Sequence, residues 1–503
     1  MTSPRPHSVA PVDLGEFAAR SHWRVQGPEP AGPLWVTGVA QDSRTVRPGD
    51  AYAALPGAHF HGADFAAQAV AGGAVAILTS PQGASRAVAT GVPVFLVDDP
   101  RAVLGALCAE VYGTATRRPH LIGITGTNGK TTTAYLITGA LDALGVTTGL
   151  IGTVETRIGA RSLRSTRTTP EAPDLHALLA VMVEQGVQTC VMEVSSHALA
   201  SHRVDGVVYD LAVFTNLSQD HLDFHDDMTS YFEAKAELFT PAHSRRGIVG
   251  VDDSWGRRLA EIATVPVETL GVVDAHWQIR AGVDQRFVLT HGDEALDLHS
   301  ALPGDFNVTN TALAAAALRT LGHSGPRVQE GLRADPRVPG RMELIEAGSG
   351  PRCIVDYAHT PEAIRSALRA LRPSTEGLLI CVTGAGGDRD RDKRADMGAA
   401  AALADIVIVT DDNPRGEDPA SIRAAVRAGA LVAATGAEVL EVADRRAAIA
   451  QAVARAAGAS PRATVAVVGK GHEPGQEIAG VVHPFDDRVV VRETLARLNG
   501  EPS

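Results

Sequence analysis

The chain has 503 residues, of which 45% are hydrophobic and 21% are charged, and its formal net charge is −12. Because a single hydrophobic core rarely grows beyond about 250–300 residues, two to four domains are expected at this length. The negative charge disfavours non-specific nucleic-acid binding. There is no apolar run near about 18 residues and no apolar signal core in residues 1–14, which predicts a cytoplasmic protein without a membrane span.

The first predicted domain comprises residues 1–116. Its apolar runs at 51–55, 74–78 and 94–97 are separated by glycine and proline, a pattern typical of short strands in a small α/β unit. The stretch 114–119 contains two arginines and a proline and predicts a linker at the end of this domain.

The second predicted domain comprises residues 117–341. A strand-like run at 121–125 leads into a glycine-rich loop, and a helix is expected from about 130 to 144, where Gly145 stops it. Further strands are expected at 189–194 and 211–215, and a helix at 305–321. We therefore predict a P-loop type of α/β domain with a mainly parallel sheet.

The third predicted domain comprises residues 342–503. Five strand-like runs alternate with helical stretches rich in alanine and arginine, which predicts a doubly wound, Rossmann-like parallel sheet. Such sheets bind ligands at the carboxyl ends of their strands, where polar motifs stand at 384–388, 411–415 and 469–473. The five runs are 353–357, 378–383, 405–410, 438–442 and 464–468.

The glycine-rich loop carries the clearest chemistry. Backbone N–H groups between a strand and a helix surround phosphate oxygens, Lys130 would reach the β- and γ-phosphates of ATP, and the Thr131 hydroxyl would bind Mg²⁺. The pattern departs from the common one because Ile124 stands in place of its first glycine, and a turn without a ligand is the alternative. The predicted ATP-binding residues here are Gly126, Thr127, Asn128, Gly129, Lys130, Thr131 and Thr132.

Two more groups are candidate Mg²⁺ ligands. Glu193 ends a buried strand beside the loop, although a helix-capping role for the stretch 193–196 is the alternative. His221 is a candidate ligand of a second ion, and a structural role is equally open to it. A zinc site formed by His221 and His225 is disfavoured, since the general-base glutamate of zinc proteases is absent.

Lysine is rare in this chain: four residues, against 42 arginines. A lysine that persists is a candidate for a function that arginine cannot perform, because its ammonium is a compact point charge and its neutral amine is nucleophilic. Chance survival under codon bias is the alternative, and for Lys235 composition alone favours a helical surface lysine with i,i+4 pairs. The four are Lys130, Lys235, Lys393 and Lys470.

Two further motifs fit a ligand held between domains. Arg341 and Asp356 flank the second domain boundary, where residues touch a ligand when domains close, and the arginine would stabilise a transferring phosphoryl group. The motif Asp411-Asp412-Asn413-Pro414-Arg415 offers a carboxylate, an amide and a guanidinium, which suit an amino acid with an amine and carboxylates. A proline-containing loop without a ligand is the alternative.

In order and spacing, these motifs resemble the Mur ligase family over almost the whole chain. Any one of them is moderate evidence, but their combination is specific. They comprise Asp42-Ser43-Arg44, the loop 126–131, Thr168-Thr169-Pro170, 193–197, 215–223, 306–310, Gly340-Arg341, 356–361, 411–415 and 469–473.

The resemblance implies a three-domain ligase that uses ATP and two Mg²⁺ ions. The family carbamylates the lysine that matches Lys235, and the new carboxylate helps to hold the second ion. The implied metal ligands are Thr131, Glu193, His221 and carbamylated Lys235, and further ATP contacts are Asn307, Asn310, Arg341 and Asp356. The first domain would hold the uridine nucleotide, with Ser43 near its uracil or diphosphate, and the muramoyl dipeptide would be held by Thr168, Thr169, Ser195 and Arg203.

The form of the 411–415 motif resembles members that add meso-diaminopimelate to UDP-MurNAc-L-Ala-D-Glu, since lysine-adding relatives lack its arginine. Departures from the family pattern at His61, Arg167 and Ser201 bear on single substrate contacts. We expect a monomer that binds small molecules. The implied diaminopimelate residues are Arg389, Asp412, Asn413, Pro414, Arg415, Gly469 and Glu473.

The expected reaction is ATP-dependent amide formation through an acyl phosphate. The same ligase chemistry with L-lysine or another diamino acid, or with folylpolyglutamate or cyanophycin-type substrates, is the nearest alternative. A P-loop kinase or NTPase switch that spends ATP without ligation is an alternative of another class, and a non-enzymatic binding module is a third.

Overall fold

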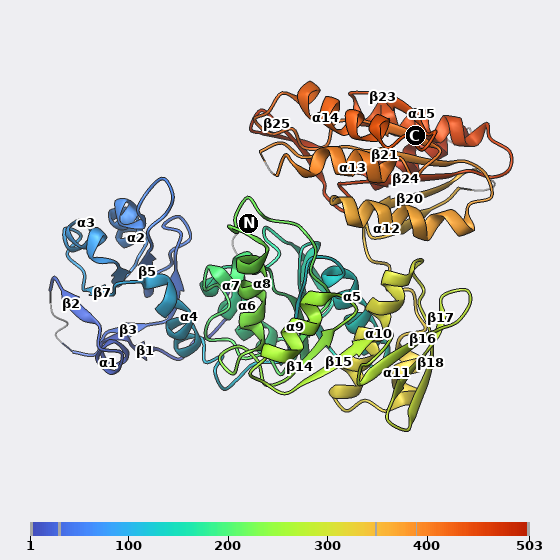
Figure 1. The fold of residues 1–503 in the computed structure, drawn as a ribbon. Helices are drawn as coiled ribbons and strands as arrows, with labels where there is room; N and C mark the ends of the chain where they lie inside the picture. Colours follow the sequence, from blue (N-terminus) through green and yellow to red (C-terminus); the bar gives the residue numbers. More distant parts are fainter. Residues whose placement is uncertain (1–3, 29–31, 348–349, 389, 500–503) are drawn as a thin grey trace.

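The computed structural model describes residues 4–28, 32–347, 350–388 and 390–499. Three lobes follow one another along the chain, and each is built around its own sheet (Figure 1). In Figure 1 the blue N-terminal lobe and the orange-to-red C-terminal lobe lie on different sides of a central lobe that runs from teal to yellow. No helix within the described ranges has the length and apolar content that crossing a bilayer requires.

The N-terminal lobe holds a five-stranded sheet in the order β2-β7-β6-β5-β4. Its strands are parallel except for β2, which pairs antiparallel with β7 at the edge. The strands are β2 (Arg24–Gln26), β7 (Val94–Leu96), β6 (Ala76–Thr79), β5 (Asp50–Ala54) and β4 (Gly38–Ala40), with helices α1 (Leu14–Arg20), α2 (Ala66–Ala71), α3 (Ala84–Val88) and α4 (Pro100–Val111).

The central lobe holds an eleven-stranded sheet in the order β11-β10-β9-β12-β8-β13-β14-β15-β16-β17-β18. The strands from β9 to β16 are parallel, and antiparallel hairpin strands extend the sheet at both ends. The strands are β8 (His120–Thr125), β9 (Thr148–Ile151), β10 (Glu155–Ile158), β11 (Arg161–Arg164), β12 (Thr189–Glu193), β13 (Leu211–Phe214), β14 (Gly247–Gly250), β15 (Val267–Gly271), β16 (Trp277–Ala281), β17 (Arg286–His291) and β18 (Glu294–His299).

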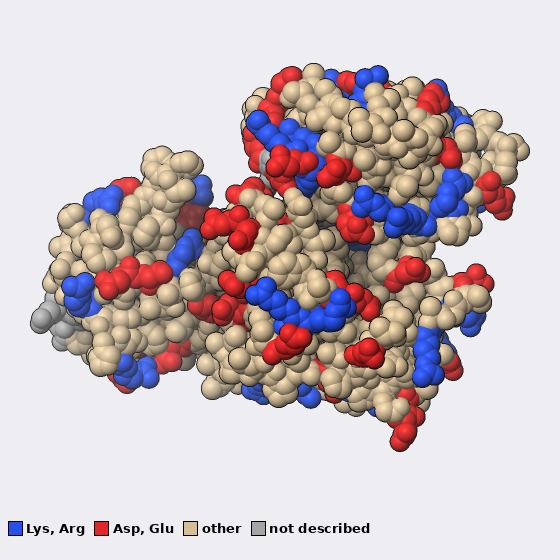
Figure 2. Space-filling view, viewed as in Figure 1, with Lys and Arg blue, Asp and Glu red and all other residues tan. Residues whose placement is uncertain are grey.

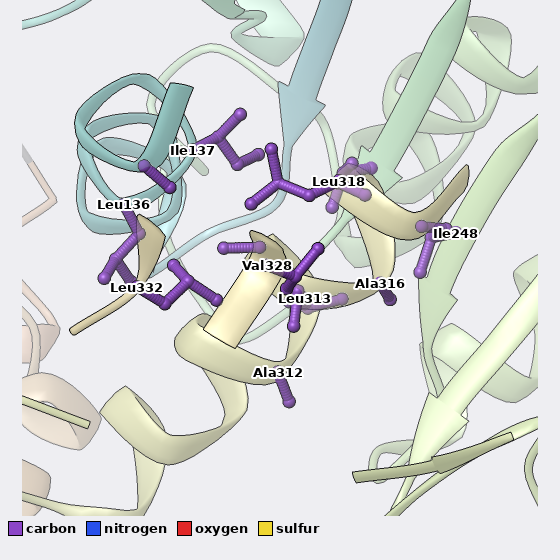
Figure 3. Packing of buried hydrophobic residues seen from close by; sticks show 14 of the residues in the cluster. Leu136, Ile137, Ile248, Ala312, Leu313, Ala316, Leu318, Val328 and Leu332 are labelled. Atoms are coloured by element: carbon purple, nitrogen blue, oxygen red, sulfur yellow. The ribbon is translucent and has the colours of Figure 1, made fainter. Parts of the chain in front are cut away.

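Helices cover both faces of the central sheet with separate apolar cores. On one face α5 (Lys130–Ala143), α10 (Asp305–Thr320) and α11 (Gly325–Gly331) pack together, and small alanines of α10 let these helices approach closely (Figure 3). The other face packs against α6 (Ala172–Glu184), α8 (Met228–Ala236) and α9 (Ser254–Ile262), and the short α7 (Ser196–Ala200) follows β12. Burial on both faces explains why β8 and β12 read as continuous apolar runs.

The C-terminal lobe holds a six-stranded sheet in the order β19-β20-β24-β21-β22-β23. All neighbours are parallel except β19, an edge strand that pairs antiparallel with β20. The elements are β19 (Glu343–Ile345), β20 (Arg352–Asp356), β21 (Leu379–Thr383), β22 (Ile406–Val409), β23 (Glu438–Glu441), β24 (Thr464–Val468), α12 (Pro361–Leu371), α13 (Lys393–Ala401), α14 (Pro419–Val432), α15 (Arg445–Ala457), α16 (Asp487–Leu498) and the hairpin β25 (Gly475–Ile478) with β26 (Val481–Pro484).

The predicted α/β architecture with mostly parallel sheets is confirmed. The helix expected at 130–144 is α5, the helix expected at 305–321 is α10, and the five apolar runs of the third region are its five parallel strands. The antiparallel additions β10, β11, β17 and β18 were not predicted, because β11 has no buried residue and the other three mix buried with more exposed positions, which gives a weak apolar signal.

Candidate functional site

The glycine-rich loop lies between β8 and α5, as predicted. Gly126 and Gly129 have φ of +141° and +87°, and a Cβ at Gly129 would stand 2.4 Å from Oδ1 of Asn310, so the close approach of α10 needs glycine there. Lys130 Nζ folds back and donates to the carbonyl oxygens of Gly126 and Thr127, both at 2.8 Å. The lysine therefore lies over the loop that would surround phosphates.

A carboxylate stands beside the loop. Thr131 Oγ1 donates to Oε2 of Glu193 at 3.0 Å, and the backbone N–H of Thr153 donates to Oε1 of Glu193 at 2.8 Å. The helix-capping alternative is excluded for Glu193 itself, because the side chain that caps α7 is Ser195, which accepts from the N–H of Ala198. The structure thus joins two of the predicted metal ligands, Thr131 and Glu193.

Lys235 corrects one expectation. It is not a surface lysine with i,i+4 pairs, because it is 1% exposed and its Nζ donates to the carbonyl oxygen of Gly126 at 2.9 Å. Burial lowers the pKa of Lys235 well below the usual value of an amine, and the nearby Lys130 charge lowers it further. Two lysines thus share one backbone oxygen, and the neutral amine is more accessible in Lys235 than in an exposed lysine.

His221 comes from the turn between β13 and α8 and has a φ of +56°. Burial lowers the pKa of His221 to about 3, so its imidazole is neutral near pH 7 and able to bind a metal. His225 instead pairs with Ser196 at 2.9 Å, and its ring lies 5.1 Å from that of Tyr231. The His221 ring lies 6.0 Å from the same tyrosine ring and 4.8 Å from that of His197, so both histidines belong to one cluster of rings.

The donors around the loop fit Mg²⁺. Within the described residues, no three side chains of His, Cys, Asp or Glu gather closely enough to hold a metal ion by themselves. Mg²⁺ does not require such a cage, since it keeps several waters and is held by one or two carboxylates together with substrate phosphates. The Thr131 hydroxyl and the Glu193 carboxylate are oxygen donors of that kind.

A cavity of about 470 Å³ adjoins the loop and lies between the central and C-terminal lobes. The surface is hollowed between these two lobes in Figure 2. The predicted ATP contacts Asn128, Gly129, Thr132, Asn307, Asn310, Arg341 and Asp356 all line it. Sequence analysis did not identify the apolar lining residues Leu217, Phe306, Ala363 and Ala367, because isolated apolar positions do not distinguish a pocket wall from a core.

Arg341 bridges the lobes at the edge of this cavity. Its Nη2 donates to Thr131 Oγ1 at 3.1 Å, and its guanidinium lies 4.4 Å from the centre of the Tyr357 ring. Asp356 accepts from the N–H groups of Met342 and Ala358, and burial raises the pKa of this carboxyl. Both residues therefore stand at the junction, as the sequence predicted.

Three of the residues expected to hold the muramoyl dipeptide lie near Glu193. Thr169 Oγ1 donates to the Glu193 carbonyl at 2.9 Å, and Thr168 Oγ1 lies 3.0 Å from Thr153 Oγ1. Ser43, expected to contact the uridine nucleotide, lies in the N-terminal lobe and donates to Gln68. Ser195 lies within 3.4 Å of Thr169, and Glu171 forms ion pairs with Arg101, Arg167 and Arg203.

The residues expected to hold diaminopimelate converge at the carboxyl edge of the C-terminal sheet. Asp412 and Asn413 follow β22, and Gly469 follows β24, where its φ of +114° lets the backbone pass the Asp412 carboxylate. Asn413 Nδ2 donates to Oε2 of Glu473 at 2.8 Å. Arg415 follows Pro414 and donates to the Gly387 carbonyl at 2.8 Å, and Arg389 lies outside the described residues.

The central and C-terminal lobes also touch through Asp220, which belongs to the 215–223 motif but had no predicted role. Lys393 Nζ lies 3.4 Å from Asp220 Oδ1, and His359 Nε2 lies 3.6 Å from Oδ2. Burial alone would raise the pKa of the Asp220 carboxyl, but His359, His221 and Lys393 together hold it well below its usual value. The retained Lys393 therefore belongs to an ionic contact between lobes.

Known proteins were compared at the level of sequence and of structure. Residues 36–112 match the Mur ligase family, catalytic domain; residues 124–318 match the Mur ligase middle domain; and residues 340–491 match the Mur ligase, glutamate ligase domain. A UDP-N-acetylmuramoyl-L-alanyl-D-glutamate–2,6-diaminopimelate ligase from Streptomyces avermitilis is 53% identical, with 99% of each chain covered.

A UDP-N-acetylmuramyl-tripeptide synthetase from Leifsonia xyli is 43% identical, over 98% of this chain and 99% of the relative. A solved structure of a UDP-N-acetylmuramoyl-L-alanyl-D-glutamate–2,6-diaminopimelate ligase superposes with a TM-score of 0.66 at 31% identity, over 96% of this chain and 99% of the other. With matching domains along the chain and such identity over nearly its full length, this protein belongs to the Mur ligase family.

Proposed function

We propose that this chain is an ATP-dependent, ADP-forming ligase that adds meso-diaminopimelate to the γ-carboxylate of D-glutamate in UDP-MurNAc-L-Ala-D-Glu. The observation that carries this proposal is the arrangement of two half-sites. A phosphate loop with Glu193 lies in one lobe and the 411–415 loop in another, and Arg341 and the Asp220–Lys393 contact lie between them.

The reaction follows from this arrangement in two steps. The γ-carboxylate of the acceptor attacks the γ-phosphorus of ATP in line, the bond to the bridging β–γ oxygen breaks, and an acyl phosphate and ADP form. The neutral amine of the amino acid then attacks the acyl carbon, phosphate leaves with the bonding electrons, and the amine gives up a proton. Lys130 and Arg341 would neutralise charge on the transferring group.

Two Mg²⁺ ions would supply further charge neutralisation on the phosphoryl oxygens when bound. We propose Thr131, Glu193, His221 and Lys235 as the residues that hold them. The buried position of Lys235 supports carbamylation, because CO₂ reacts with a neutral amine to form an N–C bond with loss of one proton. The resulting carboxylate would add the oxygen donors that Mg²⁺ prefers.

The choice of diaminopimelate depends on Arg415. Arg415 has a φ of +51°, and its side chain is 24% exposed and lies between Gly387 and Glu477. The distal carboxylate of diaminopimelate would find a bidentate partner in this guanidinium, whereas L-lysine has no distal carboxylate. We also propose domain bounds of 1–116, 117–341 and 342–503, a monomeric state, and Ser43, Thr168, Thr169, Ser195 and Arg203 as contacts of the acceptor.

The test is ADP and phosphate release with UDP-MurNAc-L-Ala-D-Glu, ATP, Mg²⁺ and a panel of amino acids. We expect release that depends on meso-diaminopimelate, together with a product heavier than the acceptor by one amino-acid residue. Release with L-lysine alone would move the assignment to the lysine-adding alternative. ADP release without any gain of mass in the acceptor would favour the kinase or NTPase alternative.

A further inference from the structure

Lys470, the one retained lysine without a role so far, lies at the amino-acid half-site. It follows β24 in the sequence Gly469-Lys470-Gly471, and its side chain is 0% exposed. A fully buried lysine is unusual, since an ammonium loses its hydration and must find partners inside the protein. Its partners therefore indicate why this position holds a lysine.

All of its closest polar partners belong to the proposed diaminopimelate site. Lys470 Nζ donates to Oδ1 of Asn413 at 3.0 Å and to Oε2 of Glu473 at 3.1 Å. Oδ1 of Asp412 lies 3.9 Å away, within ion-pair distance. A single ammonium thus contacts a carboxylate, an amide and a second carboxylate that come from two different loops.

These contacts fix the orientation of the Asn413 amide. Its Oδ1 accepts from Lys470 and from the backbone N–H of Glu477 at 3.0 Å, and its Nδ2 donates to Glu473 Oε2 at 2.8 Å. Because both sides of the amide have matched partners, a flipped amide would place donors against donors. Glu473 Oε2 is likewise held by two donors, so the direction of its carboxylate is set.

A neighbouring buried cation provides a contrast. Arg445 pairs with Asp487 through two bonds of 2.8 Å and donates to the Val468 carbonyl, and both side chains of this pair are fully buried. Neither Arg445 nor Asp487 belongs to the proposed amino-acid site. The Arg445 charge also reaches Asp412 and Glu473, but its hydrogen bonds go to Asp487 and Val468 and join α15 to α16, whereas Lys470 donates to site residues.

We propose that Lys470 is the positioning residue of the amino-acid site: it aligns Asp412, Asn413 and Glu473 for the incoming amino acid and offsets the repulsion between the two carboxylates. This inference rests on the proposed function. The ammonium suits the position because it presents three donors from one atom, whereas a guanidinium spreads its donors over a larger planar fork.

The experiment compares steady-state kinetics of the full-length Lys470→Met and Lys470→Arg variants with those of the wild type. In Lys470→Met we expect the KM for diaminopimelate to rise about ten- to a hundredfold, because charge-assisted hydrogen bonds that align the site are lost. The KM for ATP should stay within about twofold of the wild-type value, since the phosphate loop lies in another lobe. In Lys470→Arg the positive charge remains, but the KM for diaminopimelate should still rise, because the planar guanidinium does not match the acceptor atoms of Asp412, Asn413 and Glu473.

A matched control separates positioning from general stability. Val465 is fully buried on β24, the strand that precedes Lys470, so Val465→Ala should lower the melting temperature while leaving the diaminopimelate KM near the wild-type value. Acyl-phosphate formation, trapped as a hydroxamate with hydroxylamine in the absence of amino acid, should be retained in every variant. A Lys470→Met variant whose kinetics match those of Val465→Ala would overturn the proposal.

Misfolding of a variant and failure of the proposed ligase function can each be told apart from a loss of positioning. If Lys470→Met does not fold, Lys470→Arg decides, and a wild-type diaminopimelate KM in that soluble variant would overturn the proposal. The amino-acid panel on the wild type tests the ligase function itself, without any variant. If the wild type selects another amino acid, the KM for that amino acid becomes the measured quantity, and the positioning role stands or falls on the same comparison.

Discussion

At the scale of single residues, burial decides what each lysine can do. Lys130 and Lys235 both donate to the carbonyl oxygen of Gly126, at 2.8 and 2.9 Å. Burial lowers the pKa of both amines, and the Lys130 charge lowers that of Lys235 further. Lys130 stands in the glycine-rich loop, where the proposed function needs a cation, and the lowered pKa of Lys235 supports its proposed role as a neutral, nucleophilic amine.

The first prediction concerns Lys235. Replacing it with arginine should lower the rate of ligation by about a hundredfold or more, because a guanidinium stays protonated and forms no carbamate. Lys235→Ala should be equally impaired, and a short carboxylic acid added to the assay should restore part of its activity. ADP release with all three substrates measures both effects, and a fully active Lys235→Arg enzyme would exclude the carbamate.

The second prediction concerns Arg415. Arg415→Ala should raise the KM for diaminopimelate about ten- to a hundredfold, since a bidentate carboxylate contact is lost, while the KM for ATP stays unchanged. The control is Arg446→Ala, which removes an exposed arginine paired with Glu493 in the same lobe. An unchanged diaminopimelate KM in Arg415→Ala would remove Arg415 from the site.

At the scale of elements, the segment before β19 crosses the loop after β24. Gly340 has a φ of +62°, and a Cβ there would stand 2.2 Å from the backbone nitrogen of His472. Gly471 faces the same crossing, with a φ of +54°. The His472 ring lies 5.1 Å from that of Tyr357, which also contacts Arg341, so the crossing links the two proposed half-sites.

The third prediction tests this crossing. Gly340→Ala should lower the melting temperature and raise the KM for diaminopimelate, because the new methyl group displaces the backbone that carries Lys470 and Glu473. Gly436→Ala is the matched control: its φ is also positive, at +83°, but its Cβ would meet open space, so only a strain of about 1 kcal/mol is expected. Equal effects of the two substitutions on this KM would argue against the crossing as the cause.

At the scale of the whole molecule, the linker after the N-terminal lobe contacts the central lobe through a histidine whose protonation depends on pH. His176, on α6, lies 2.5 Å from the hydroxyl of Thr114 in the linker, and its Nε2 lies 3.1 Å from the Asp205 carbonyl. A carbonyl only accepts, so Nε2 carries the proton and Nδ1 accepts from Thr114. Burial lowers the pKa of His176 to about 4, which keeps the ring neutral at pH 7.

The fourth prediction follows from this pKa. The unfolded chain takes up a proton at His176 near pH 6.5, and the folded chain does so only near pH 4, so the free energy of unfolding falls as the pH drops through this window. The loss amounts to about 2 kcal/mol at pH 5. His176→Gln should therefore show a smaller fall in melting temperature between pH 7 and pH 5 than the wild type, and an equal fall would contradict the assignment.

Much of the site could be predicted from sequence because its motifs are local. The loop 126–131 lies between a strand and a helix, and the 411–415 and 469–473 motifs follow strands of one parallel sheet, so pattern alone placed them at its carboxyl edge. The surface position expected for Lys235 was wrong, since a lysine on a helix gives no local sign of the face on which it lies. Phe306 was not recognised as a wall residue of the cavity between the central and C-terminal lobes, because a single apolar position does not show whether it faces a cavity or a core.

The sequence by itself determined the α/β class, the order of the motifs and the kinds of chemistry they support, because these depend on residues a few positions apart. Only the tertiary structure decided which lysines are buried and which groups they contact. Lys235 and Gly126 are 109 residues apart, and Lys470 and Asn413 are 57 apart. Such contacts depend on how whole sheets and helices pack, and no local pattern of side chains specifies that packing.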